Sequence, residues 1–300
     1  MKNPHYVWGV ILSLFIGLCY GMAVPFSKML ASSGISPMTI VLYRTVFSSI
    51  FWAVVLYLQN GWTSFRIDRS VLFYFALIGF FSFVLKSCGL IMSYKYLTVQ
   101  FAIMLNYLAP ICTIFLNSYL NKEKPRVLQI FASLLVVFGL VYAFNGFGED
   151  FSTPLLGLFF AAISVAGSSL NTAYCSFVVR KYKPGICQQI FYCHFSAVIL
   201  LFVIKSFSSG WGDMALITPN AFFNLNMVAL ATGVCSTFCF CVAVRLISSS
   251  TLQILSSTEI LMTLILVPLI AGILPTGREV IGSIIIFIAL ALATVSGKES

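Results

Sequence analysis

The chain has 300 residues, of which 60% are hydrophobic and only 8% are charged, and its formal net charge is +9. This small number of charged side chains cannot cover the surface of a water-soluble protein of this length. The composition therefore excludes a water-soluble protein and predicts one embedded in a lipid bilayer. No Lys/Arg run interleaved with aromatic residues stands apart from the apolar stretches, so the positive charge does not indicate nucleic-acid binding.

The predicted elements are apolar stretches that can cross a membrane as helices, which takes about 20 residues each. In chain order, the first five lie at about 7–27, 38–58, 71–94, 99–120 and 127–145. Five more follow at about 155–179, 186–207, 222–246, 249–272 and 279–296. We therefore expect an all-α membrane protein with ten transmembrane helices, numbered here as spans 1 to 10.

The second five spans repeat the first five at an offset of about 150 residues. Gly17, Ile40 and Ser133 each have the same residue type at the offset position. Because each copy has an odd number of spans, the second copy must enter the membrane from the opposite side. Inverted repeats of this kind are typical of secondary transporters. We expect two inverted five-helix repeats, at 7–146 and 155–296.

The distribution of Lys and Arg predicts the orientation of the chain. With the N-terminus inside, eleven of the 17 basic residues fall on the inside and four on the outside, and two lie within spans, Arg44 and Lys86. Cytoplasmic loops of membrane proteins carry such an excess of basic residues. We expect both termini to be cytoplasmic, in a bacterial inner (plasma) membrane with lipid around the spans.

Polar residues at helical spacing predict which spans face one another. In span 4, Asn106, Pro110, Thr113 and Asn117 fall on one face of a helix, and Ser256 is the image of Asn106 in span 9. Polar groups turn away from lipid because hydrocarbon cannot satisfy them. We expect spans 3, 4, 8 and 9 to line a shared interior. Spans 5 and 10 carry few polar residues and are expected at the periphery, facing lipid or a second subunit of a homodimer.

Four ionisable residues within spans are candidates for chemistry. Glu259 in span 9 is either a proton carrier or substrate-amine anchor, or the structural partner of a base. Lys86 in span 3 either contacts a substrate carboxylate or phosphate, or neutralises Glu259. Arg44 in span 2 either clamps a carboxylate or reaches a helix end or the interface. His194 in span 7, the image of Arg44, is either a pH-sensitive group or a satisfied polar residue of the bundle.

Several uncharged residues complete the candidate substrate site. Asn106 and Asn171 can each donate and accept hydrogen bonds to a polar solute, although bonds between helices are an equal alternative. Pro110 removes a backbone hydrogen bond inside span 4 and exposes a carbonyl, as in the broken helices of transporter sites. Tyr107 can stack on a planar group or simply pack in the bundle. Thr113, which lies on the polar stripe of span 4, is also a candidate residue of the substrate site.

The order and spacing of six residues resemble the EamA-type branch of the drug/metabolite transporter superfamily: Lys28, Arg44, Pro110, Glu123, Gly139 and Gly282. The resemblance covers nearly the whole chain and implies two five-helix halves. The run from Asn106 to Pro110 also resembles the amino-acid exporter branch, which implies an amino-acid substrate.

The sequence carries no sign of an energy-coupling or catalytic site. It contains no phosphate-binding GxxxxGK[ST] run, HExxH motif or Ser/His/Asp set, so we expect no enzyme activity and no cofactor. Cys235, Cys239 and Cys241 lack the spacing of a metal site. We expect a secondary transporter for a small polar organic metabolite, an amino acid or derivative in the first instance, with proton coupling through Glu259. The alternatives are a nucleoside-containing metabolite such as S-adenosylmethionine, and efflux of cationic drugs.

Overall fold

The computed structural model describes residues 4–93, 96–97, 105–122, 126–143, 155–208, 210–271 and 277–296. These residues form helices and connecting turns, with no strand among them, so the all-α prediction is confirmed. Six helical stretches in this part of the chain are long and apolar enough to cross a membrane. They are Pro4–Ser32, Pro37–Gln59, Arg69–Ser93, Leu155–Tyr182, Ile186–Ser208 and Pro219–Leu246.

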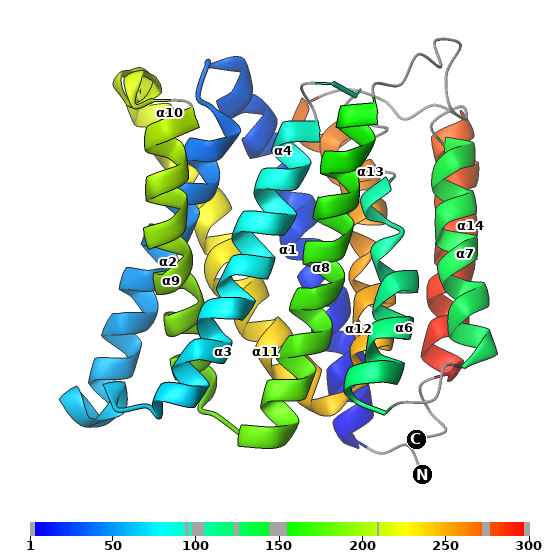
Figure 1. The fold of residues 1–300 in the computed structure, drawn as a ribbon. Helices are drawn as coiled ribbons and strands as arrows, with labels where there is room; N and C mark the ends of the chain where they lie inside the picture. The colour runs from blue at the N-terminus through cyan, green and yellow to red at the C-terminus, as the bar shows by residue number, and fades with distance from the viewer. Residues whose placement is uncertain are drawn as a thin grey trace.

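The helices described in the first half of the chain lie between Pro4 and Ala143. They are α1 (Pro4–Ser32), α2 (Pro37–Asn60), η1 (Gly61–Phe65), α3 (Arg69–Gly79), η2 (Phe80–Cys88), α4 (Gly89–Ser93), α6 (Ala109–Leu120) and α7 (Val127–Ala143). The second half contains α8 (Leu155–Tyr182), α9 (Ile186–Ser208), η3 (Gly212–Leu216), α10 (Pro219–Val228), η4 (Ala229–Cys235), α11 (Ser236–Leu246), α12 (Ser249–Ser256), α13 (Thr258–Ala271) and α14 (Gly277–Ser296). Figure 1 shows them as a bundle of helices that lie side by side with their axes roughly aligned.

Helix starts in the connecting turns follow local capping chemistry. The Ser36 side chain accepts a hydrogen bond from the Thr39 backbone N–H at the start of α2, and Pro37 occupies the first turn. Thr218 caps α10 in the same way through Ala221, again ahead of a proline. An oxygen-bearing cap satisfies a free N–H, and proline has no N–H to lose, so both sequences favour a helix start.

The third span of each half contains a π-helical segment. In the first half, η2 links α3 to α4, and in the second half η4 links α10 to α11. The two segments start about 150 residues apart, at Phe80 and Ala229. π-helical turns are rare and occur frequently at functional sites, because the extra residue re-aims the side chains around it. Lys86 lies in η2 and Thr232 in η4.

The fourth span of each half is interrupted at the matching position. In the first half a turn at Tyr107 and Leu108 precedes α6, and in the second half Ser257 separates α12 from α13. Pro110 therefore lies in the first turn of α6, where its missing N–H would have no intrahelical acceptor, and not inside a continuous helix as the sequence predicted. Glu259 likewise lies in the first turn of α13.

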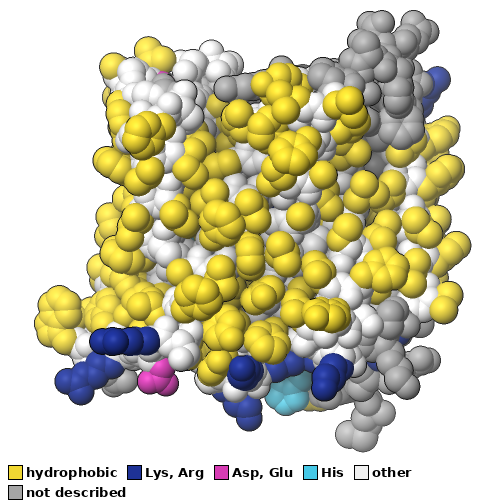
Figure 2. Space-filling view, in the orientation of Figure 1, with side chains coloured by type: hydrophobic (Ala, Val, Ile, Leu, Met, Phe, Trp, Pro, Cys, Tyr) yellow, Lys and Arg dark blue, Asp and Glu magenta, His cyan; other side chains and the backbone are white. Residues whose placement is uncertain are grey.

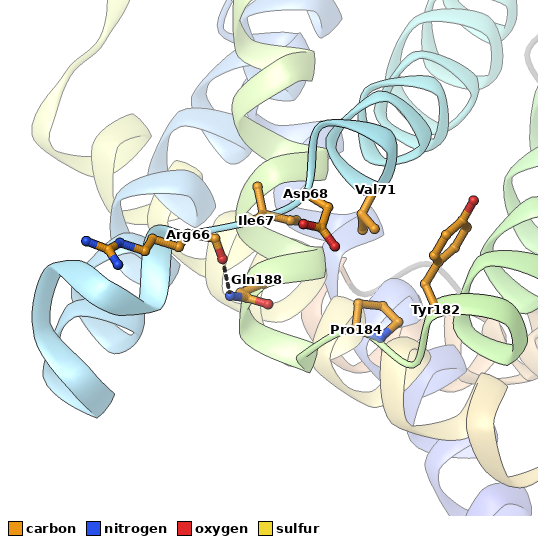
Figure 3. A pocket seen from close by; sticks show the side chains of 7 residues that line it. All are labelled: Arg66, Ile67, Asp68, Val71, Tyr182, Pro184 and Gln188. Carbon is orange, nitrogen blue, oxygen red and sulfur yellow. Dashed lines mark hydrogen bonds between the residues drawn. The ribbon is translucent and has the colours of Figure 1, made fainter.

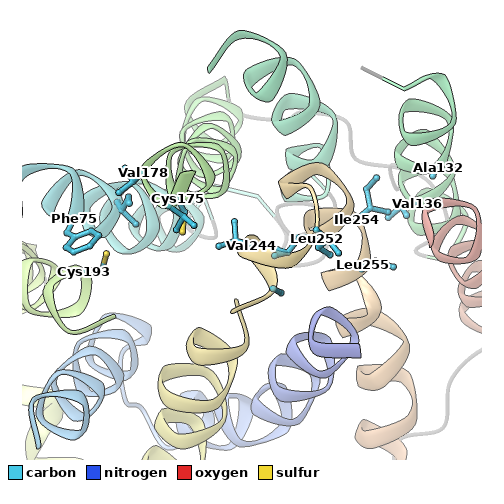
Figure 4. Close-up of a cluster of buried hydrophobic side chains, with 14 of the residues drawn as sticks. Phe75, Ala132, Val136, Cys175, Val178, Cys193, Val244, Leu252, Ile254 and Leu255 are labelled. Atoms are coloured by element: carbon cyan, nitrogen blue, oxygen red, sulfur yellow. The ribbon is translucent and has the colours of Figure 1, made fainter. Parts of the chain in front are cut away.

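The largest apolar cluster runs across the bundle between helices of both halves. Figure 4 shows Phe75 and Cys193 on one side, Val244 and Leu252 in the middle, and Val136 of α7 on the other side. A separate cluster of Ala23, Leu30, Ile35, Ile40, Ala221, Leu225 and Val228 joins the other end of α1 to α2 and α10. Burial of these side chains holds the two halves together at both ends.

Helices α7 and α14 pack against each other at one edge of the bundle (Figure 1). A Cβ added at Gly139 of α7 would lie 2.9 Å from the Gly282 carbonyl oxygen of α14, so the two backbones touch. Phe138 and Phe287 are exposed on these helices. Spans 5 and 10 thus lie at the edge, and the homodimer through them remains a prediction.

Candidate functional site

Four ionisable or hydroxyl-bearing side chains from different helices form a charged array in the interior. Tyr20 comes from α1, Arg44 from α2, Lys86 from the π-helical η2 and Glu259 from the start of α13. Along α1, Tyr6 and Val10 contact the largest apolar cluster, while Ala23 belongs to the second cluster. The array therefore lies between the two apolar layers, away from both ends of the bundle.

In one part of the array, Lys86 interacts with both Tyr20 and Glu259. Its ammonium lies 5.8 Å from the centre of the Tyr20 ring, a cation–π geometry. It also interacts electrostatically with the Glu259 carboxylate. Glu259 also lies in the first turn of α13, at the end of a helix that favours a negative charge.

Small residues hold these two charged groups in place. A Cβ at Gly167 of α8 would lie 2.5 Å from the Lys86 backbone nitrogen, and one at Gly17 of α1 would lie 2.7 Å from the Glu259 backbone nitrogen. The helices thus approach at backbone distance beside each charge, as small residues permit in membrane proteins.

Arg44 forms the other half of the array. Its guanidinium lies 5.5 Å from the centre of the Phe83 ring and donates a long hydrogen bond of 3.5 Å to Thr232 Oγ1 in η4. His194 of α9 packs on the same Phe83 ring, with ring centres 4.9 Å apart. Arg44 and His194, which occupy matching positions in the two halves of the sequence, therefore meet on one aromatic ring.

The remaining predicted residues lie around the interrupted spans. Asn106 accepts a hydrogen bond of 3.3 Å from Ser164 of α8, and Tyr107 packs against the largest apolar cluster. Pro110 is buried. Asn171 is half-buried on α8, and among the described residues it has no side-chain hydrogen bond. Asn106 is close to Lys86 through Ser164, which also donates to the Lys86 carbonyl oxygen at 2.8 Å.

The hydroxyl groups of two predicted site residues donate hydrogen bonds to backbone carbonyls of their own helices. Thr113 Oγ1 donates to the Ala109 carbonyl at 2.8 Å, and Ser256 Oγ donates to the Gln253 carbonyl at 2.8 Å. Such bonds satisfy a buried hydroxyl locally. Asn117, on the same stripe, donates to Ser250 of α12 at 2.9 Å and so joins the two halves. The substrate contacts of Thr113 and Ser256 remain predictions.

The sequence reasoning missed a buried ion pair at the end of the bundle away from the termini. Lys205 of α9 is fully buried and donates to Asp213 Oδ1 at 2.9 Å and to Thr39 Oγ1 at 2.6 Å. Asp213 also accepts hydrogen bonds from the Ser36 backbone N–H at 3.0 Å and from Thr39 Oγ1. Burial alone would raise the pKa of Asp213, but the hydrogen bonds from Ser36, Thr39 and Lys205 hold it well below its usual range.

A shallow hollow of about 340 Å³ lies between the α2–α3 and α8–α9 connections. Figure 3 shows its lining, with Asp68 and Tyr182 facing across it and Gln188 donating to the Arg66 carbonyl. It is not at the charged array. On the face in Figure 2, most Lys and Arg side chains gather at this same end, below a broad hydrophobic band and where the chain termini lie. Among the described residues, no group of His, Cys, Asp and Glu is arranged to hold a metal ion.

The helical architecture and apolar surface define a multi-pass membrane protein. Residues 7–145 match the EamA-like transporter family. The predicted resemblance to this family is therefore confirmed over that segment, which is slightly less than half of the chain. Of the residues that carried the resemblance, Glu123 and the Lys28 side chain lie outside what the structure describes, whereas Arg44, Pro110, Gly139 and Gly282 lie within it.

Three curated relatives share the same degree of similarity. The chain is 25% identical over 201 residues to the uncharacterized inner membrane transporter YhbE of Escherichia coli strain K12, with 65% of this chain and 58% of YhbE covered. The YhbE proteins of E. coli O157:H7 and Shigella flexneri match equally. The aligned part thus spans well under two thirds of these relatives.

The fold also has a counterpart among solved structures. One crystal structure superposes with a TM-score of 0.79 over 97% of this chain and 99% of the other, at 14% sequence identity. This likeness concerns the fold alone.

Proposed function

We propose that the protein is a secondary transporter that moves a small polar organic metabolite across a bacterial inner membrane. The observation that carries the proposal is the matched interruption of the interior helices. Each half has a π-helical segment in its third span and a break in its fourth, at an offset of about 150 residues. Broken helices around buried charges are characteristic of transporter binding sites.

These matched features also support two inverted repeats of five helices, at 7–146 and 155–296. The Lys and Arg side chains that gather at the end of the bundle near the termini support a cytoplasmic location for both termini. An inverted pair can exchange conformations, so that one central site opens alternately to each side. The name of the relative YhbE, an inner membrane transporter, agrees with this activity and location.

The substrate class that the site favours is amino acids or their derivatives. The array offers two cations, Lys86 and Arg44, for a carboxylate, and one carboxylate, Glu259, for an amine or a proton. Asn106 beside Lys86 and the half-buried Asn171 add neutral hydrogen-bonding capacity. The interior contains no described carboxylate pair that would favour a dication.

The proposal is tested by a substrate screen in proteoliposomes, with and without an imposed proton gradient. The panel contains amino acids, S-adenosylmethionine and cationic drugs. Accumulation of one amino acid or derivative above its equilibrium level, only with the gradient, is the expected result. Accumulation of a cationic drug alone would support efflux instead, and no movement of any compound would reject the transport function.

A further inference from the structure

The protein compensates the two cations of the charged array differently. Lys86 interacts with the Glu259 carboxylate. Arg44 has no carboxylate against it among the described residues; Tyr20 and His194 are ionisable groups that interact with it. When Lys86 and Glu259 are both ionised, their charges cancel, and Arg44 then keeps a positive charge that no described carboxylate compensates.

The guanidinium of Arg44 is also poorly satisfied in its hydrogen bonds. It can donate five hydrogen bonds, yet among the described residues it donates one long bond of 3.5 Å, to Thr232 Oγ1. Its Nε is buried without a partner in the described part of the chain. Buried donors in folded proteins are nearly always paired, so an unpaired guanidinium nitrogen beside an uncompensated charge indicates a place for an anionic acceptor.

His194 adds a second unpartnered polar atom to the same place. Its side chain is only 2% exposed, and its Nδ1 contacts the Ile190 carbonyl oxygen at 2.9 Å. A carbonyl can only accept, so the proton is on Nδ1. Its Nε2 is buried and has no partner among the described residues. Nε2 is therefore an acceptor, which suits a donor of the same ligand, and it lies near the guanidinium because both side chains contact the Phe83 ring.

We propose that Arg44 binds the carboxylate of the transported substrate, with Tyr20 and Thr232 beside it and His194 lining the same region. Every good substrate therefore carries a free carboxylate. The planar fork of a guanidinium matches a carboxylate through two parallel hydrogen bonds. One carboxylate also neutralises the excess charge, and Lys86 stays with Glu259. The inference rests on the proposed transport function and narrows its substrate class.

The first test uses the unmodified full-length protein in detergent. L-amino acids and the matching L-amino-acid amides are added in turn, and the shift in the unfolding temperature of the protein is measured for each. The amides are nearly the same size as the acids but lack the carboxylate. At least one acid is expected to stabilise the protein, with an apparent affinity about tenfold or more above that of its amide. Equal stabilisation by acid and amide, or stabilisation by amides alone, overturns the proposal, as does the absence of stabilisation by any acid.

The second test assigns the carboxylate to Arg44. Arg44→Gln removes the charge, and Arg44→Lys keeps the charge but loses the fork geometry. Both are expected to reduce the preference for the acid, the lysine variant less so, since it folds with the charge in place. Arg66→Gln removes an exposed arginine from the cytoplasmic connection and serves as the matched control, with an unchanged preference. A full preference for the acid in the Arg44 variants overturns the assignment.

The outcomes separate this inference from the transport function. If proteoliposomes accumulate an amide or another solute without a carboxylate, transport stands and the carboxylate inference fails. If acids bind through Arg44 but nothing crosses the membrane, the inference stands and the transport function fails.

Discussion

At the scale of single residues, the energetics of the interior depend on how two cations share one carboxylate. A charge moved from water into the bundle loses several kcal/mol of solvation, and a partner repays this only while both charges are present. Glu259 has two sources of compensation, Lys86 and the start of α13. Loss of the Glu259 carboxylate therefore removes an ionisable group from the interior and leaves the Lys86 ammonium without its counter-charge, which destabilises the fold.

Glu259→Gln separates a coupling role from a structural one. The amide keeps the shape and hydrogen bonding of the side chain but cannot ionise. If Glu259 carries the coupling proton, uphill transport is lost while exchange of substrate at equal concentrations persists. Uptake and exchange in proteoliposomes measure the two activities.

A structural role gives a different pattern for the same residue. In that case Glu259→Gln lowers the unfolding temperature, because Lys86 is left uncompensated, and adding Lys86→Met restores both folding and transport. Full gradient-driven uptake by Glu259→Gln alone would exclude the coupling role.

The buried pair of Lys205 and Asp213 makes a second residue-scale prediction. Asp213→Asn leaves the fully buried Lys205 without a counter-charge, so we expect a loss of about 3 kcal/mol in the free energy of unfolding. The double variant with Lys205→Met should recover much of that loss. Denaturation of the purified variants measures both values, and a stable single variant would contradict the expectation.

The same pair predicts how stability depends on pH. Because folding lowers the pKa of Asp213, the unfolded chain takes up this proton first as the pH falls. The contribution of the pair is fully present above the ordinary carboxyl pKa of about 4 and is lost below it, toward the lowered folded-state pKa. Unfolding temperatures measured from pH 7 to pH 3 should fall more steeply for the wild type than for Asp213→Asn.

At the scale of elements, the sequence predicted the spans better than their interruptions. Hydropathy identifies a helix of membrane-spanning length but cannot distinguish α- from π-helical turns, so η2 and η4 were not predicted. Pro110 signalled the break in span 4 but was placed inside the helix, whereas Ser257 gave no comparable signal in span 9.

The candidate site shows a similar limit. A polar stripe indicates which face avoids lipid and pointed to Asn106, whereas ionisable residues within spans pointed to Lys86 and Glu259. Spacing cannot reveal that a hydroxyl such as Thr113 bonds to its own helix, because that choice depends on side-chain rotamers. The pair of Lys205 and Asp213 also escaped prediction, because it forms only where the turn after α9 brings Asp213 back to Lys205 and Thr39 packs against both.

The packing of η2 on α8 predicts an unusual response to a helix-favouring substitution. Propensity alone would make Gly167→Ala stabilising by about 1 kcal/mol. The new methyl group would, however, lie 2.5 Å from the Lys86 backbone nitrogen and 2.8 Å from the Phe81 carbonyl oxygen, where backbone must move. Overpacking of this kind costs about 1–3 kcal/mol, so it should win.

We therefore expect Gly167→Ala to lower the unfolding temperature and to reduce transport by displacing Lys86. Gly212→Ala in η3 is the control, since a Cβ there has nothing within 4 Å. The same unfolding temperature and uptake rate for both variants would show that η2 accommodates the methyl group of Gly167→Ala without loss.

At the scale of the whole molecule, the proposed exchange between two inverted halves needs a defined orientation. α1 begins and α6 ends at the end of the bundle where Lys and Arg gather, whereas α9 ends at the opposite side (Figures 1 and 2). The positive-inside rule then puts Lys122, just after α6, in the cytoplasm, and Ala215 of η3 outside.

Single cysteines at Lys122 and Ala215, in a background without the nine native cysteines, test this orientation. Both positions are exposed, so a thiol reagent can reach them on whichever side they lie. A membrane-impermeant reagent added to intact cells should label Ala215→Cys, and should label Lys122→Cys only after the membrane is permeabilised. The reversed pattern would place both termini outside. Labelling of both positions from one side would remove the odd number of crossings between them, and with it the physical basis for two inverted halves sharing one site.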